Sequence, residues 1–167
     1  MMTLIKNGNV VEDPFIDCTE MDILPKSGAL IVSVAQWQDH WEKLVRRPDP
    51  IGVQLKSHEH PEIISDDLES LTVIALEFPT FKDGRAYSYA RLLRERYGFT
   101  GELRAVGDVL PDQIHFMERV GFNSVEIDSD NALADFERAT KEFTVWYQPS
   151  GDARQRAAEL RRGQKQG

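Results

Sequence analysis

From Ala29 onward, short apolar segments alternate with segments of helical periodicity. Strands are predicted, in chain order, at residues 29–34, 51–56, 72–78, 102–107 and 122–127. Helices or helical turns are predicted after them at 35–47, 61–71, between Asp83 and Gly98, at 110–120 and at 131–147. Because parallel strands need a crossover connection, usually a helix, this alternation predicts five βα units in a mainly parallel α/β sheet.

Five units are too few for a closed eight-stranded barrel within one chain. An open three-layer sheet with helices on both faces is therefore our first expectation. Five units that curl without closing, as a partial TIM-like barrel, are the alternative. In either arrangement the carboxyl ends of the parallel strands lie along one edge, where ligands meet such folds.

The N-terminal segment departs from this rhythm. Residues 3–12 carry two β-prone runs around Asn7-Gly8, a pair that suits the positive φ angles of a hairpin turn. Residues 13–28 are predicted to be loop. We expect one α/β domain over residues 1–148, the hairpin included, followed by a polar, disordered tail at 149–167.

Composition excludes several classes of protein. The 167 residues are 41% hydrophobic and 29% charged, which describes a globular domain. No apolar run reaches the roughly 20 residues that cross a bilayer, and we expect a cytoplasmic protein without membrane contact. The single cysteine, Cys18, rules out an internal disulfide framework. A net charge of -8 argues against nucleic acid as a partner.

Residues 81–108 concentrate arginine in an otherwise acidic chain. Arg85 lies near a predicted helix start, where free N–H groups favour an anion, and Gly84 would let the backbone approach it. Solvated helix surface is the alternative for these arginines, and helix capping is the alternative for Asp108. The candidate anion site comprises Glu77, Lys82, Asp83, Gly84, Arg85, Tyr87, Arg91, Arg94, Arg104, Asp108 and Gln113.

Motifs for other chemistry are weak. His58 and His60 form an H-x-H pair, but the remaining histidines lie in predicted helices without ligand-like spacing. The sequence has no G-x-G-x-x-G, no phosphate-binding P-loop and no G-x-S-x-G elbow. We therefore expect no metal and no cofactor, and no catalytic residue is assigned.

Residues 78–113 read F-P-T-F-K-D-G-R-A-Y-S-Y-A-R-L-L-R-E-R, then G-E-L-R-A-V-G-D-V-L-P-D-Q after a short connection. This block resembles an uncharacterised bacterial family, the domain of unknown function numbered nine hundred thirty-four, and weaker resemblance extends upstream to most of the chain. Members are typically encoded beside assimilatory sulfite reductase, so the resemblance implies a role in sulfur assimilation. It implies no known reaction and carries over no established catalytic residues.

Three functions follow as expectations. The first is an accessory protein of sulfite reduction that binds sulfite reductase components through an arginine-rich surface. The second is a small enzyme or oxyanion-binding protein acting on a sulfur or phosphate compound at the carboxyl edge of the sheet. The third is a structural dimer without a ligand site. Exposed sheet edges and helix faces also favour a homodimer.

Overall fold

The computed structural model describes residues 2–128, 131, 134–135 and 137–138. Eight strands form one sheet in the order β2-β1-β8-β7-β6-β5-β4-β3. Their bounds are β1 Met2–Lys6, β2 Asn9–Val11, β3 Phe15–Asp17, β4 Ala29–Ser33, β5 Ile51–Leu55, β6 Val73–Phe78, β7 Glu102–Gly107 and β8 Ser124–Asp128.

Strands β3 to β8 run parallel, and β1 of the N-terminal hairpin runs against them. Strand β1 pairs antiparallel with both β2 and β8, so that Met2 lies opposite Asp128 and Lys6 lies opposite Ser124. The hairpin turn has positive φ angles at Asn7 and Gly8, which confirms the turn predicted from that pair.

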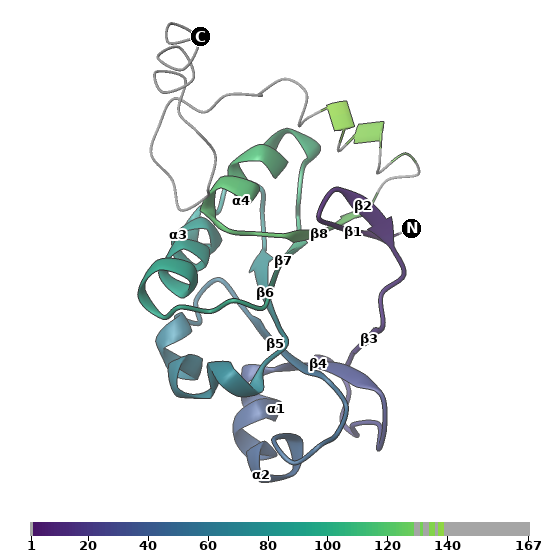
Figure 1. Cartoon of the computed structure of the whole chain (residues 1–167), viewed down its shortest axis with the longest axis vertical. Helices are drawn as coiled ribbons and strands as arrows, with labels where there is room; N and C mark the ends of the chain where they lie inside the picture. The colour runs from purple at the N-terminus through teal and green to yellow at the C-terminus, as the bar shows by residue number, and fades with distance from the viewer. Residues whose placement is uncertain (1, 129–130, 132–133, 136, 139–167) are drawn as a thin grey trace, which may run out of the picture.

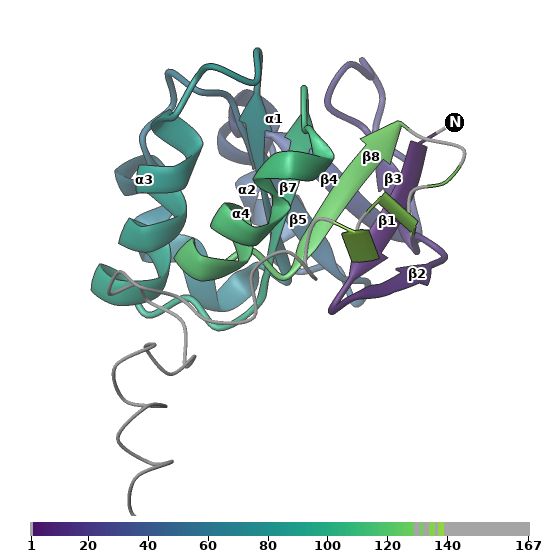
Figure 2. The same ribbon diagram turned by 90° about the horizontal axis from the view of Figure 1, so that it is seen from above.

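The sheet is curled, and its helices lie on the convex side (Figure 1, and turned by 90° in Figure 2). They are α1 Val34–Asp39, α2 Trp41–Leu44, α3 Arg85–Arg91 and α4 Ile114–Val120, with 3₁₀ segments at Pro61–Ser70 and Pro111–Gln113 and a π-helical turn at Leu92–Arg96. Within the described residues, no helix is long and apolar enough to span a membrane.

The mainly parallel α/β class is confirmed, but the units are less regular than predicted. The expected helix at 35–47 is divided at His40, and the connection over Pro61–Ser70 is 3₁₀ rather than α-helical. The curled arrangement corrects our first expectation of an open sheet with helices on both faces. The predicted helix at 131–147 and the tail at 149–167 lie almost entirely outside the described residues.

Strand β3 was missed, because its three residues lie in a segment that we predicted to be loop. Phe15 pairs with Ala29 and Asp17 pairs with Ile31, which adds a sixth parallel strand. A run this short carries too little alternation to reveal a strand. Its position follows from the neighbouring β4 rather than from its own sequence.

Alternation along the strands divides the sheet into two different faces. Leu76 and Phe78 of β6 belong to the convex core, which they share with Trp37 of α1 and Leu93 of the π-helical turn. The other face of β6 carries Ala75, which pairs in register with Arg104 of β7. The concave face therefore holds charged residues, whereas the same face of a sheet covered by helices on both sides would be apolar.

A close approach between β6 and β7 requires glycine at position 107. Gly107 has a φ angle of +92°, and it lies opposite Phe78 at the carboxyl end of the pair. A Cβ atom there would overlap the Phe78 carbonyl oxygen, which accepts a hydrogen bond of 2.7 Å from the amide of Asp108. This glycine sets where the loop after β7 begins.

We expect Gly107→Ala to lower the free energy of unfolding by about 2 kcal/mol or more, because both the φ angle and the overlap oppose a side chain. Urea unfolding followed by circular dichroism measures the change. Gly84→Ala is the matched control, since position 84 has no atom within 4 Å of an added Cβ. An equal, small effect of both substitutions would show that the β6–β7 contact tolerates a methyl group.

Candidate functional site

The guanidinium of Arg85 is held at the carboxyl edge of the sheet by residues from two connections. Its Nε donates to Asp83 Oδ1 at 3.0 Å, and its Nη2 donates to Asp83 Oδ2 at 2.6 Å and to Ser57 Oγ at 2.8 Å. Ser57 follows β5 and Asp83 follows β6, so Arg85 bridges two neighbouring loops. The predicted convergence of loops at this edge is present around Arg85.

Asp83 already neutralises much of the charge that an incoming anion would meet. Hydrogen bonds from the side chain and backbone of Arg85 lower the pKa of Asp83 to about 2, so this carboxylate stays ionised at neutral pH. The Arg85 side chain remains 53% exposed. A ligand could therefore approach the guanidinium from solvent, but it would compete with a carboxylate that is already bound.

Asp108 and Gln113 hold the loop that follows β6. The Asp108 carboxylate accepts a hydrogen bond of 2.9 Å from the amide of Phe81, and the Gln113 side-chain amide donates one of 2.9 Å to the Phe81 carbonyl oxygen. Asp108 thus supports a neighbouring loop, and the alternative that it caps the following helix is wrong, because that helical segment has no side-chain cap. Both residues therefore hold the loop before α3 through the backbone of Phe81, at the same edge of the sheet as Arg85.

Other predicted residues around this edge have separate surroundings. Glu77 is half-buried and pairs in register with Val106, which places it on the concave face with Arg104. Lys82 is exposed, with its amine 5.7 Å from the centre of the Phe81 ring. Gly84, the N-cap residue of α3, is also exposed.

Tyr87 is packed rather than presented to solvent. Its ring meets that of Phe78 edge-on, with 5.2 Å between the ring centres. Burial raises the pKa of Tyr87 to about 12, so the phenol stays protonated at neutral pH.

Arg94 lies at the opposite edge of the sheet, among the connections that lead into β7 and β8. Its Nη1 donates to the carbonyl oxygens of Phe99 and Gly101 at 2.7 and 2.8 Å. Its Nε and Nη2 donate to the Gly121 carbonyl oxygen at 3.0 and 2.9 Å. Desolvation lowers the pKa of Arg94, while these carbonyls satisfy its donors. Arg94 joins two connections and is not placed near Arg85.

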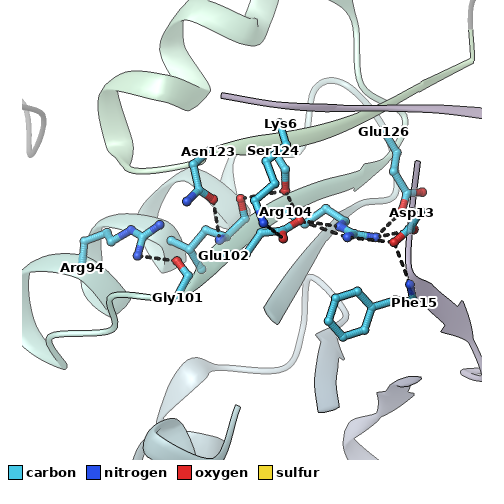
Figure 3. Close-up of polar contacts among 11 residues, drawn as sticks. Lys6, Asp13, Phe15, Arg94, Gly101, Glu102, Arg104, Asn123, Ser124 and Glu126 are labelled. Atoms are coloured by element: carbon cyan, nitrogen blue, oxygen red, sulfur yellow. Dashed lines mark hydrogen bonds and ion pairs between the residues drawn. The ribbon is translucent and has the colours of Figure 1, made fainter. Parts of the chain in front are cut away.

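Arg104 forms a buried charge cluster on the concave face (Figure 3). Its guanidinium lies 2.7 Å from Asp13, 3.0 Å from Glu102 and 3.3 Å from Glu126, counted between nitrogen and carboxylate oxygen. The ring of Phe15 lies 5.6 Å from the guanidinium carbon. Only 1% of the Arg104 side chain is exposed, so the guanidinium itself offers no open face to a substrate.

Glu102 connects this cluster to the N-terminal hairpin. It accepts hydrogen bonds of 2.8 Å from Lys6 and 2.6 Å from Ser124. Burial raises the pKa of Glu102, but these hydrogen bonds and the charge of Arg104 outweigh burial, so its pKa lies below the ordinary value. Burial dominates at Glu126, whose pKa is raised despite Arg104. As the pH falls, the folded state therefore loses stability through Glu102, whose pKa is lowered, and gains stability through Glu126, whose pKa is raised.

The exposed cationic groups lie on the outer side of the molecule. Arg85, Ser88 and Arg91 are exposed at three-residue spacing along α3, and Arg91 is 51% exposed with Glu95 at 3.8 Å. Two exposed rings lie on neighbouring segments: Phe81, which is 42% exposed, in the loop before α3, and Phe116, which is 51% exposed, on α4, which packs against α3. We call the whole set the α3 surface; it comprises Phe81, Lys82, Arg85, Arg91, Arg96 and Phe116.

One histidine of the H-x-H pair, His60, caps the 3₁₀ segment that follows it. His60 Nδ1 accepts a hydrogen bond of 3.1 Å from the amide of Glu62, and its ring meets that of Tyr89 edge-on. The nitrogen that accepts this bond serves as the N-cap of the 3₁₀ segment. His58 is exposed beside it.

Sequence reasoning missed Asp13, which is the partner that closes the charge cluster. It lies 91 residues from Arg104 along the chain. Asp13 sits in the predicted loop, and a single carboxylate in a loop has no pattern that distinguishes it from a solvated one. Glu102, by contrast, could have been paired with Arg104, because residues two apart in a strand share a face.

We expect Arg104→Met to lower the free energy of unfolding by about 3–5 kcal/mol at pH 7, because buried carboxylates would lose their cation. The deficit should shrink at pH 4. In the native protein the lowered pKa of Glu102 contributes stability above pH 4.5, the ordinary pKa of a glutamate, and this contribution is lost as the pH falls. In the variant the same carboxyl groups can bind protons and relieve their repulsion.

Urea unfolding at pH 7 and pH 4 measures both effects. Arg91→Met is the control, because its exposed pair with Glu95 should contribute less than about 0.5 kcal/mol. A deficit for Arg104→Met that stays constant between the two pH values would contradict the assignment of the carboxylates.

Comparison with known proteins places the chain in a family. Residues 52–158 match the model described as a bacterial protein of unknown function, DUF934. No curated protein matches the chain. The match begins within β5 and covers α3, the π-helical turn, Arg104 and the loop that Asp108 supports. Because it spans more than half of the sequence, the chain belongs to the DUF934 family of bacterial proteins of unknown function.

Proposed function

We propose that this chain is a cytoplasmic accessory protein of assimilatory sulfite reduction, which binds a component of sulfite reductase through the α3 surface. The pathway rests on the family resemblance described under Sequence analysis. The mode of action rests on the positions of the arginines. A protein that acts through contact needs an exposed recognition surface and no enclosed reaction site.

The division of the arginines carries this proposal. Arg94 and Arg104 direct their donors at backbone carbonyls and carboxylates inside the fold. Arg85 and Arg91 have about half of their side chains exposed, and the exposed rings of Phe81 and Phe116 lie on the preceding loop and on the neighbouring helix α4. Arginine and aromatic residues are enriched at the centres of protein interfaces, because both give large contact areas and specific polar contacts.

Charge indicates the kind of partner. The whole chain has a formal charge of -8, yet the α3 surface presents Lys82, Arg85, Arg91 and Arg96, of which Arg85 and Arg91 are paired with Asp83 and Glu95. A local basic surface on an acidic protein orients its approach to an acidic patch while the remaining surface repels that patch. We therefore propose an acidic surface on the reductase component as the binding site.

A small oxyanion at the carboxyl edge is the second candidate function. Arg85 favours it, because Asp83 and Ser57 hold the guanidinium in place while about half of it faces solvent. If β4 to β8 and their connections are taken as a partial TIM-like barrel, this is the edge where such folds bind phosphate. Sulfite, sulfate or phosphate would have to compete with Asp83 for the guanidinium.

We expect the purified chain to bind reductase components, and Arg91→Glu to weaken that binding by about tenfold at low salt, because a repulsive charge replaces an attractive one. Binding should also weaken as the ionic strength rises. Biolayer interferometry measures both. Arg46→Glu is the matched control, since Arg46 is exposed beyond α2 and outside the α3 surface. Absence of a complex at low salt would refute the proposal.

Thermal melts with sulfite, sulfate and phosphate test the second function separately. A concentration-dependent rise in Tm that is lost in Arg85→Ala would support an oxyanion site. No rise, or an equal rise in both proteins, would exclude Arg85 as its ligand. Either result leaves the reductase-binding experiment to be judged independently.

A further inference from the structure

A groove opens at the α2 end of the molecule, between α2 and the segment that joins β3 to β4. Its volume is about 360 Å³. The floor is apolar and the rim carries charges of both signs. The lining residues are Asp22, Ile23, Leu24, Pro25, Lys26, His40, Lys43, Leu44 and Arg47.

The rim of this groove exposes an aliphatic side chain to water. Ile23 is 86% exposed, and it is the most exposed of the large apolar residues in the described part of the chain. Met21, two residues earlier, is 41% exposed, and Ile16 of the adjoining edge strand β3 is 42% exposed. Contiguous exposed apolar groups of this kind mark surfaces that a partner covers.

The segment that carries Ile23 is held in place, so its exposure is not that of a loose loop. Arg47 donates hydrogen bonds of 2.9 and 3.2 Å from Nη1 to the carbonyl oxygens of Pro25 and Lys26, and one of 2.9 Å from Nη2 to that of Gly28. Asp49 accepts a hydrogen bond of 3.0 Å from the Gly28 amide. An interface residue that is already ordered loses little freedom on binding.

The protruding side chain and the cavity belong to one patch. A two-fold interface needs a surface that complements itself, with a group on each copy that fits a recess on the other. Ile23 is such a group, and the recess over Leu24, Pro25 and Leu44 is lined by the same segment. The rim also combines Asp22 with Lys26 and Lys43, so opposite charges can face each other across the axis.

We propose that this patch is a homodimer interface, in which Ile23 of each copy enters the groove beside α2 of the other. Strand β3 stands at the end of the sheet order, so the interface would continue along an edge strand. The patch lies at the α2 end, away from α3 (Figure 1). A dimer formed here would leave both α3 surfaces exposed, and the proposal stands independently of the proposed function.

Sedimentation velocity over about 1–100 μM chain tests the dimer and its location. The unaltered chain should sediment as a dimer, and Ile23→Glu should raise the dissociation constant by roughly 100-fold, because each groove would receive a charge. The matched control is Ile63→Glu, since Ile63 is 45% exposed on the 3₁₀ segment outside the groove. A monomer at all concentrations, or equal dimers in both variants, would overturn the proposal.

A second measurement does not depend on how the glutamate variant folds. Benzoylphenylalanine placed at position 23 should crosslink, on irradiation, to a peptide of the second copy that contains Lys43 or Arg47. Mixing isotopically labelled and unlabelled chains identifies crosslinks between copies by mass spectrometry. Crosslinks only within one chain, or between copies at α3, would overturn the assignment of the interface.

Discussion

The buried guanidinium of Arg104 imposes the strictest requirement on this fold. An ionised group in a dry interior is costly unless several partners satisfy its donors. Those partners come from three places, since Glu102 lies on β7, Glu126 lies on β8 and Asp13 lies between β2 and β3. Strands β2 and β3 stand at opposite ends of the sheet order, and only residues 12–14 join them, so the sheet must curl for that short segment to carry Asp13 across the concave face. Charge pairing and curvature therefore depend on each other.

Arginines that look alike in the sequence serve three different purposes. Arg104 holds the carboxylates of the concave face together, and Arg94 joins the two connections at the amino edge of the sheet. Arg85 and Arg91 lie on the outside of the molecule. The difference follows from the element on which each stands. A charged side chain on the concave face of a central strand needs an oppositely charged partner, whereas a charged side chain on the outer side of α3 stays hydrated. This division is the basis of our proposal that the chain acts through a contact surface.

Sequence patterns predicted the local features and missed those that depend on distant residues. The alternation from Ala29 gave five of the six parallel strands, and Asn7-Gly8 gave the hairpin, because both signals lie within a few residues. Strand β3 is too short to show alternation, and its pairing depends on β4. At the carboxyl edge, the convergence around Arg85 followed from the strand rule, but its pairing with Asp83 and the support of Phe81 by Asp108 are side-chain choices that spacing does not determine.

The pairing of β1 with β8 has a consequence for biosynthesis. The hairpin leaves the ribosome first, and its partner strand is made only after all the other strands. Until β8 emerges, Ile5 lacks its neighbours on the convex side, and Lys6 lacks Glu102 until β7 is made. Contacts between residues so far apart in the sequence form slowly. During most of its translation, the hairpin therefore presents β1 as a strand edge without its partner, the kind of edge through which chains can associate wrongly.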